Sequence, residues 1–195
     1  FYTTGDLADR WGFDVVLGNP PWDKIMPAAK EFFAGIDFEI LAAGSQAERD
    51  EREKKLRSNP KIQEQFSQYW DSFERDKRAL DVLYEWQNVE VEGHKSGAQP
   101  DLYRYFAERC AQIVHREGRI GLVLPSAFHA NEGATGIRRL YLEEMKLHCC
   151  YSFENRRKLF EIDSRFKFAL VIAARNGPTD TFRCAYYLLH DEWLF

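Results

Sequence analysis

The sequence predicts an α/β fold built on a mostly parallel sheet, and three observations favour this class. A short apolar run at residues 13–18 ends in a rigid turn, and from residue 101 onward helical and extended patterns alternate. A long charged stretch with helical spacing separates these two regions. Alternating helices and strands are typical of sheets whose parallel strands are joined by helices.

The first expected strand is the run 13–18, which ends at the tetrapeptide Asn19-Pro20-Pro21-Trp22. Two consecutive prolines fix φ at two positions and keep the residue before each one extended. The carbonyl groups of Asn19 and Pro20 are therefore aimed before any ligand binds. Because open α/β sheets bind their ligands at the carboxyl ends of the strands, we expect a functional site at this turn.

Residues 30–100 are expected to form a helical insertion within the α/β domain. Charges of both signs are interspersed between 48 and 57 without Pro or Gly, which indicates an exposed helix. Large apolar residues recur at mostly helical intervals between 61 and 89, which indicates a second helix with one packed face.

A regular order of helices and strands is expected after the insertion. Its elements are a helix that begins near residue 101 and stops at Gly118, a strand at 119–124, a helix at 137–145 and a strand at 148–153. Two further strands, 166–174 and 181–189, are separated by Asn176-Gly177-Pro178, which is typical of a turn. We expect these two strands to pair as a hairpin, which gives the parallel sheet an antiparallel edge strand.

The tetrapeptide at residues 19–22 carries groups that suit an exocyclic amine. The N6 nitrogen of adenine is conjugated with its ring, so it is a poor nucleophile until both N–H bonds are engaged by acceptors. The Asn19 side-chain oxygen and the Pro20 carbonyl are two such acceptors on adjacent residues. Trp22 offers a flat face for a base, and base–aromatic stacking is worth roughly 1–3 kcal/mol.

Asn19-Pro20-Pro21-Trp22 resembles the (Asp/Asn/Ser)-Pro-Pro-(aromatic) catalytic motif of S-adenosylmethionine-dependent amino-methyltransferases. The resemblance is to adenine-N6 DNA methyltransferases of the type I and type IIG restriction-modification kind in particular. It implies a Rossmann-like class I methyltransferase sheet and site-specific methylation in restriction-modification or phage defence. It also implies S-adenosylmethionine as a cofactor contacted by Asn19 and Pro20, and double-stranded DNA with a flipped adenine as the substrate.

The resemblance extends along the second half of the chain. Residues 118–128 look like the strand and Pro-containing loop of these methylases, and residues 138–140 resemble the helix that follows. Leu159-Phe160 and the run 166–172 are similar to the segment that places a Phe on the second face of the base. By this match Phe160 is the first candidate for stacking, with Phe166 and Phe168 as the next candidates.

The net charge of −4 excludes a generic nucleic-acid-binding protein, because nonspecific affinity for DNA comes mainly from neutralised phosphates. A local basic cluster is nevertheless present at Arg156, Arg157, Lys158, Arg165 and Lys167. We expect Arg156 and Arg157 to contact the DNA substrate. An ordinary solvated cluster is the alternative.

The chain is expected to be part of a longer protein. It begins with Phe1, and no Gly-rich turn precedes residue 19, whereas the family binds the amino acid portion of its cofactor with such a turn. Residues 1–195 are thus expected to form a partial methyltransferase catalytic domain, inactive alone, whose partners include other domains or subunits of the parent.

Two alternative functions stay open. The same motif serves amino or amide methyltransferases that act on RNA or protein. A function of another class is a noncatalytic DNA-binding or partner-binding module of a larger defence complex.

Membrane and metal functions are not expected. The apolar runs are far shorter than the roughly 20 residues that span a bilayer, and the amino terminus lacks a signal-peptide pattern, which favours a cytoplasmic setting without a membrane partner. The His and Cys residues show no metal-ligand spacing.

Overall fold

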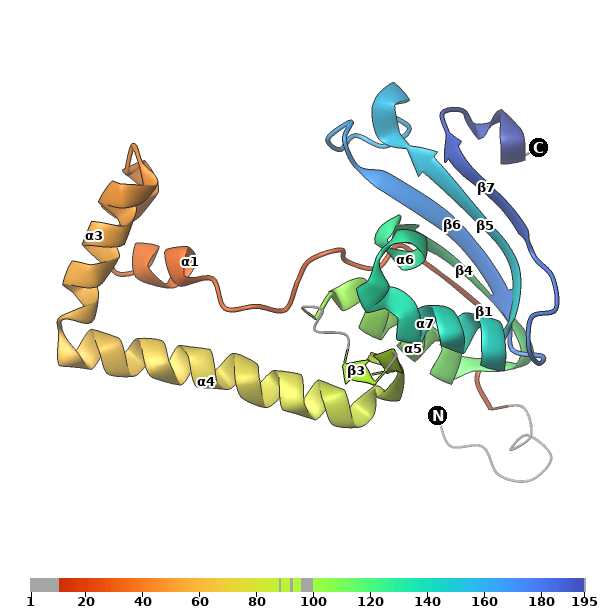
Figure 1. Ribbon diagram of the computed structural model, residues 1–195, viewed down its shortest axis with the longest axis horizontal. Helices are drawn as coiled ribbons and strands as arrows, with labels where there is room; N and C mark the ends of the chain where they lie inside the picture. The colour runs from red at the N-terminus through yellow and green to blue at the C-terminus, as the bar shows by residue number, and fades with distance from the viewer. Residues whose placement is uncertain (1–10, 88, 92, 96–99, 195) are drawn as a thin grey trace. The chain divides into compact units, whose positions relative to one another are not determined.

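The computed structural model describes residues 11–87, 89–91, 93–95 and 100–194 (Figure 1). The chain divides into two compact units. The sheet unit comprises residues 1–24 and 81–195, and the helical unit comprises residues 25–80. Within the described ranges, the helices are too short or too polar to cross a membrane.

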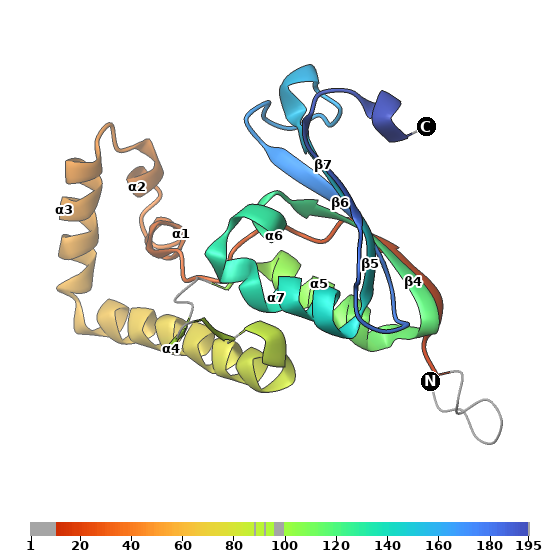
Figure 2. The ribbon, with the colours of Figure 1, turned by 45° about the vertical axis from the view of Figure 1, so that its right-hand side comes forward.

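The sheet unit is built on one five-stranded sheet (Figures 1 and 2). In spatial order its strands are β1 (Phe13–Gly18), β4 (Val114–Pro125), β6 (Lys167–Ala174), β5 (Lys146–Glu154) and β7 (Arg183–Leu188). The β1–β4 and β5–β7 pairs are parallel, whereas β6 is antiparallel to both of its neighbours. Four of the five strands therefore run in one direction, which confirms the prediction of a mostly parallel α/β sheet.

The predicted hairpin between the last two strands is wrong. β6 lies between β4 and β5, and β7 forms the edge by pairing in parallel with β5. The antiparallel strand is thus internal and not at the edge. The burial of the strands explains this order, because β6 is largely buried whereas β7 is mostly exposed. A strand buried on both faces belongs in the interior of a sheet.

The main core lies between the sheet and the helices on one of its faces (Figure 2). These helices are α5 (Leu102–Ile113), α6 (Ala127–Ala130) and α7 (Thr135–Arg139). Side chains at alternate positions of β4, namely Ile120, Leu122 and Leu124, are buried against them. Tyr141 is fully buried in this core, and its hydroxyl donates to the carbonyl of Ala107 at 3.0 Å.

Short elements complete the sheet unit. They are η2 (Glu85–Gln87), β2 (Glu90–Val91), β3 (His94–Lys95), η3 (Glu132–Ala134), η4 (Leu140–Glu144), η5 (Asn155–Arg157) and η6 (Asp191–Leu194). β2 and β3 form a separate two-stranded ladder.

The helical unit ends earlier than the insertion predicted at 30–100, because residues 85–87 pack into the sheet unit. The Gln87 side chain donates to the Glu108 carboxylate at 2.7 Å, and the Trp86 amide donates to the same carboxylate at 3.3 Å. Positions 88, 92 and 96–99 of the predicted insertion lie outside the described residues.

Four helices make up the helical unit: α1 (Ala29–Ala34), α2 (Glu39–Ala42), α3 (Gln46–Arg57) and α4 (Pro60–Leu83), of which α4 continues into the sheet unit. Its small core contains Phe33, Ile40 and Phe66, and the rings of Phe33 and Phe66 stack at 4.8 Å. The Arg57 guanidinium lies 4.3 Å from the centre of the Phe66 ring and covers this core. As the sequence predicts for residues 48–57, no residue of α3 is buried.

A Gly136→Ala variant tests the packing of η2 against α7. A Cβ atom at Gly136 would lie 1.8 Å from the Trp86 carbonyl oxygen, so the backbone must shift. We expect the free energy of unfolding to fall by about 1–3 kcal/mol, as for other overpacked sites. Denaturant unfolding measures this loss. Gly44→Ala is the control, because its nearest atom would be 3.9 Å away, and equal losses in both variants would contradict the packing described.

Candidate functional site

The candidate site lies where two loops leave the same edge of the sheet. β1 ends at Gly18 beside Leu122 of β4, and the tetrapeptide at residues 19–22 follows directly. β5 ends at Glu154 beside Lys167 of β6, and the loop 155–166 follows. Since β1 and β5 run in the same direction, both loops emerge at the carboxyl edge of the sheet.

The two loops line an open cavity of about 300 Å³. It is lined by Asn19, Pro20, Pro21, Trp22, Phe160 and Ile162. Five of these are candidate residues from the sequence, and the structure brings them together. Ile162 was missed, although it is an apolar residue between two acids in the same loop.

Asn19 and Pro20 lie at the wall of the cavity in different environments. Pro20 is buried, whereas Asn19 is exposed. Among the described residues, the Asn19 side chain makes no hydrogen bond, so its amide oxygen is free to accept one. The site therefore offers two acceptors of fixed backbone position at the end of β1.

Trp22 is partly buried and packs against the cluster formed by Phe153, Phe168 and Leu188 of the sheet. Its ring lies 6.2 Å from the ring of Phe166 at an interplanar angle of 45°. Its Nε1–H is buried and finds no acceptor in the described part of the chain. With almost no accessible surface, this N–H is out of reach of a group in the cavity, so Trp22 offers its ring and not this donor.

The three phenylalanine candidates occupy three different positions. Phe168 is only 3% exposed and stacks on Phe153 at 5.3 Å, so it belongs to the core. Phe160 is 37% exposed, packs edge-on against Phe168 at 4.7 Å and lines the cavity. Phe166 is half-exposed and supports Trp22. Of the three, Phe160 alone lines this cavity.

The far end of the Asn-Pro-Pro-Trp turn is tied to the start of α5. The Leu102 amide donates to the Asp23 carbonyl at 2.9 Å, and the backbones of Lys24 and Asp101 pair in an isolated antiparallel β-bridge. Burial raises the pKa of the Asp101 carboxyl, and the charges of Arg104 and Lys24 oppose this shift. The turn is thus fixed at both ends, by β1 and by α5.

Acidic neighbours neutralise part of the basic cluster. Glu154 pairs with Arg156 at 2.6 Å and with Lys167 at 3.0 Å, while Arg165 pairs with Asp163 at 2.6 Å. The hydrogen bond from Lys167, together with the charge of Arg156, lowers the pKa of Glu154.

Arg157 and Lys158 differ from the three paired residues of the cluster, Arg156, Arg165 and Lys167. In the described ranges of the chain, neither makes an ion pair, and both are exposed. Candidate residue Arg157 is therefore free, whereas candidate residue Arg156 is already paired.

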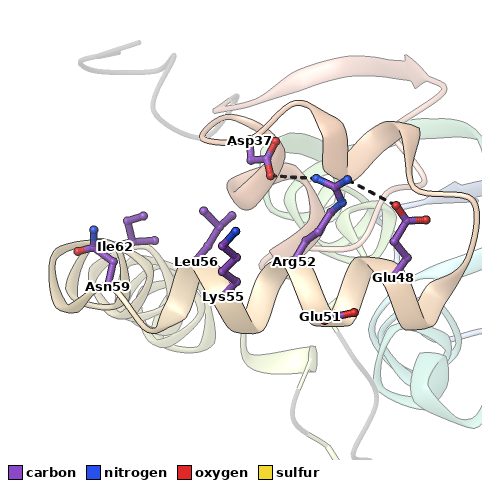
Figure 3. Close-up of a pocket in the computed structure, with 8 residues that line it drawn as sticks. All are labelled: Asp37, Glu48, Glu51, Arg52, Lys55, Leu56, Asn59 and Ile62. Carbon is purple, nitrogen blue, oxygen red and sulfur yellow. Dashed lines mark ion pairs between the residues drawn. The ribbon is translucent and has the colours of Figure 1, made fainter.

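A larger cavity lies in the helical unit (Figure 3). Arg52 lines this cavity, and its guanidinium lies 2.6 Å from Glu39, 3.5 Å from Glu48 and 3.6 Å from Asp37. These three carboxylates pair with the Arg52 guanidinium, so its charge is balanced within the protein. We therefore assign this charged cluster to the packing of α2 and α3.

One histidine contacts a serine in the sheet unit. His129 Nε2 lies 2.9 Å from Ser152 Oγ, and burial together with the charge of Arg138 lowers the pKa of His129. Ser152 is buried within β5, so it is not placed to attack a substrate. Among the described residues, no group of three His, Cys, Asp or Glu side chains is arranged to hold a metal ion.

Sequence comparison points to one family. Residues 69–160 match the family model of the Eco57I restriction-modification methylases. The match favours a methyltransferase of the restriction-modification kind. It covers slightly less than half of the chain, ends at Phe160 and leaves out residues 19–22. No curated protein matches the chain.

Several solved structures are similar to the chain. A modification subunit assigned to a type I restriction enzyme of Vibrio vulnificus YJ016 has 16% identity and a TM-score of 0.40, over 55% of this chain and 24% of its own. The EcoKI M protein of a type I restriction enzyme has 16% identity and a TM-score of 0.38. This match covers 50% of the present chain and 22% of the EcoKI protein.

A nuclease-deletion mutant of the type ISP restriction-modification enzyme LlaGI, in complex with a DNA substrate mimic, has 15% identity and a TM-score of 0.45. This match covers 91% of the present chain and 13% of that enzyme. The chain thus spans a quarter or less of each of these three structures.

Two truncations test the different positions of Phe168 and Phe160. We expect Phe168→Ala to lower the free energy of unfolding by about 3–5 kcal/mol, as for other core phenylalanines. Phe160→Ala removes a partly exposed ring and should cost about 1–2 kcal/mol. Denaturant unfolding of both variants makes the comparison, and equal losses would show that Phe160 is a core residue.

Proposed function

We propose that this chain carries the target-base site of an S-adenosylmethionine-dependent methyltransferase that acts on the N6 nitrogen of adenine in DNA. The single observation that carries the proposal is the cavity that joins residues 19–22 with Phe160. It combines two acceptors with two aromatic side chains on different loops. The family match over 69–160 supports the restriction-modification setting.

In this mechanism the chain orients the amine and shields it from water. The Asn19 amide oxygen and the Pro20 carbonyl accept the two N6 hydrogens, so that the nitrogen lone pair becomes available for in-line attack. Trp22 and Phe160 bind the faces of an adenine extruded from double-stranded DNA. S-adenosylmethionine, when bound, supplies the methyl group together with its leaving group.

We also assign Asn19 and Pro20 to the cofactor site. They follow β1 directly, at the edge where open α/β sheets bind nucleotide cofactors, and the Asn19 amide, which makes no hydrogen bond to the described residues, suits this role. The helical unit is proposed as an insertion that docks on other domains or subunits of the parent protein.

Contacts to the DNA backbone are proposed for the loop 155–166. Arg157 supplies a free charge, and Arg156 becomes available when phosphate competes with Glu154 for its guanidinium. The loop thus places positive charge beside the cavity that receives the base.

Transfer of labelled methyl from S-adenosylmethionine tests the proposal. The full-length protein should label DNA, and nucleoside analysis should place the label in N6-methyladenine. Asn19→Ala should lower kcat by about 100-fold to 1,000-fold, because one charge-stabilising acceptor is removed.

Asn176→Ala serves as the control for this experiment, because Asn176 follows β6 at the opposite edge of the sheet. Label found in RNA or protein in place of DNA would shift the function to an amino or amide methyltransferase. If the folded protein binds the cofactor but labels neither DNA, RNA nor protein, the remaining function is that of a noncatalytic module.

Glu154→Gln tests the role of the basic loop in DNA binding. The change releases Arg156 and Lys167 from their ion pairs. We expect tighter binding and a salt dependence that steepens by roughly 0.9 for each additional phosphate contacted. Titration of labelled duplex DNA at several salt concentrations measures both.

Glu161→Gln is the matched control for this charge change. Glu161 is an exposed acid of the same loop, and it makes no ion pair with the described residues. Equal gains in DNA affinity for the two variants would show that the ion pairs of Glu154 do not keep Arg156 and Lys167 from the DNA.

A further inference from the structure

Asn155 is the only polar residue of the loop 155–166 that is fully buried in the described structure, at 0% exposure. It follows directly on β5 and begins the loop that supplies Phe160 and Ile162 to the cavity. A buried amide is costly unless its donors and acceptor are satisfied. The partners of Asn155 therefore show what it stabilises.

The side-chain amide of Asn155 bonds to the backbone at both ends of the segment 160–162, which lines the cavity. Its Oδ1 accepts from the Phe160 amide at 2.9 Å, and its Nδ2 donates to the Phe160 carbonyl at 3.0 Å and to the Ile162 carbonyl at 3.1 Å. Its own backbone N–H donates to the Phe166 carbonyl at 3.0 Å, which closes the base of the loop.

Apolar burial does not replace these bonds. Leu159, Phe160, Ile162 and Phe166 are all at least one-third exposed, so the loop has little core of its own. The chain reverses at Lys158 in a left-handed conformation, with φ of 52°, and the Lys158 amide donates to the Asn155 carbonyl at 2.9 Å. One buried amide thus fixes the backbone of both loop residues that line the cavity.

We propose that Asn155 is a positioning residue that sets the place of Phe160 against the target base; this inference rests on the function proposed above. Asn155 acts through the backbone of Phe160, while the Phe168 ring packs edge-on against the Phe160 ring. The residue contacts neither base nor cofactor. Loss of the Asn155 amide should displace the Phe160 ring and leave the acceptors of Asn19 and Pro20 in place.

A double-mutant cycle between Asn155 and Phe160 tests the proposal in the full-length protein. Asn155→Ala should lower kcat/KM for DNA by about 100-fold, as expected for a misplaced binding group, with KM for S-adenosylmethionine unchanged. In a Phe160→Ala background the same change should have little further effect, because the ring that it positions is absent. Additive losses would overturn the proposal.

Hydrogen–deuterium exchange gives a readout that does not depend on activity. The Phe160 amide should be protected in the unsubstituted protein and should exchange rapidly in Asn155→Ala, while amides of β4 and β6 keep their protection. Asn176→Ala, at the opposite edge of the sheet, should change neither the exchange of the Phe160 amide nor the kinetics. Unchanged protection of Phe160 in Asn155→Ala would overturn the proposal.

Asn155→Asp keeps the experiment decisive if the Ala variant unfolds. The carboxylate retains an acceptor for the Phe160 amide but faces the Phe160 and Ile162 carbonyls without a donor. Protonation restores one donor, so the activity of this variant relative to the unsubstituted protein should rise as the pH falls. A constant ratio across the pH range would contradict the role of Nδ2.

The two proposals fail in different ways. If the unsubstituted protein methylates no DNA, both the proposed function and the positioning role are overturned, even where exchange shows that Asn155 holds the loop. If it methylates DNA and the losses are additive, the positioning role alone is overturned.

Discussion

The internal strand β6 is the element on which the site depends. It is hydrogen-bonded to β4 on one side and to β5 on the other, and the segments that follow these two strands are hydrogen-bonded to the chain at its start. The Lys167 carbonyl accepts from Ser126, which follows β4, and the Phe166 carbonyl accepts from Asn155, which follows β5. Phe168 then supports Phe160. A shift of β6 would therefore move one wall of the cavity.

Local patterns predicted most of the individual elements but not their order in the sheet. Gly118 and Pro125 bound the central part of β4, and the alternation of Ile120, Leu122 and Leu124 predicts its buried face. The position of β7 could not be predicted in this way, because Asn176-Gly177-Pro178 indicates a turn without saying which strand comes next in space. The pairing partner is decided by burial of β6 on both faces, which is a tertiary property.

The candidate site was only partly visible in the sequence. Residues 19–22 were identifiable because one tetrapeptide contains both the acceptors and the aromatic ring. Phe160 was found by resemblance, and only the folded structure shows that it lines the same cavity. Asn155 was missed because an asparagine before two arginines is typical of an exposed turn. The ion pair of Glu154 with Arg156 was missed because sequence alone does not show which charges face each other.

The central claim is that the cavity between residues 19–22 and Phe160 binds a flipped adenine. The most direct measurement is a crystal structure of the full-length protein with a nonreactive analogue of S-adenosylmethionine and DNA that contains its own methylation site. We expect an extruded adenine between Trp22 and Phe160, with N6 within hydrogen-bonding distance of the Asn19 and Pro20 oxygens. An adenine that stays stacked in the duplex, or one bound by other residues, would contradict the account.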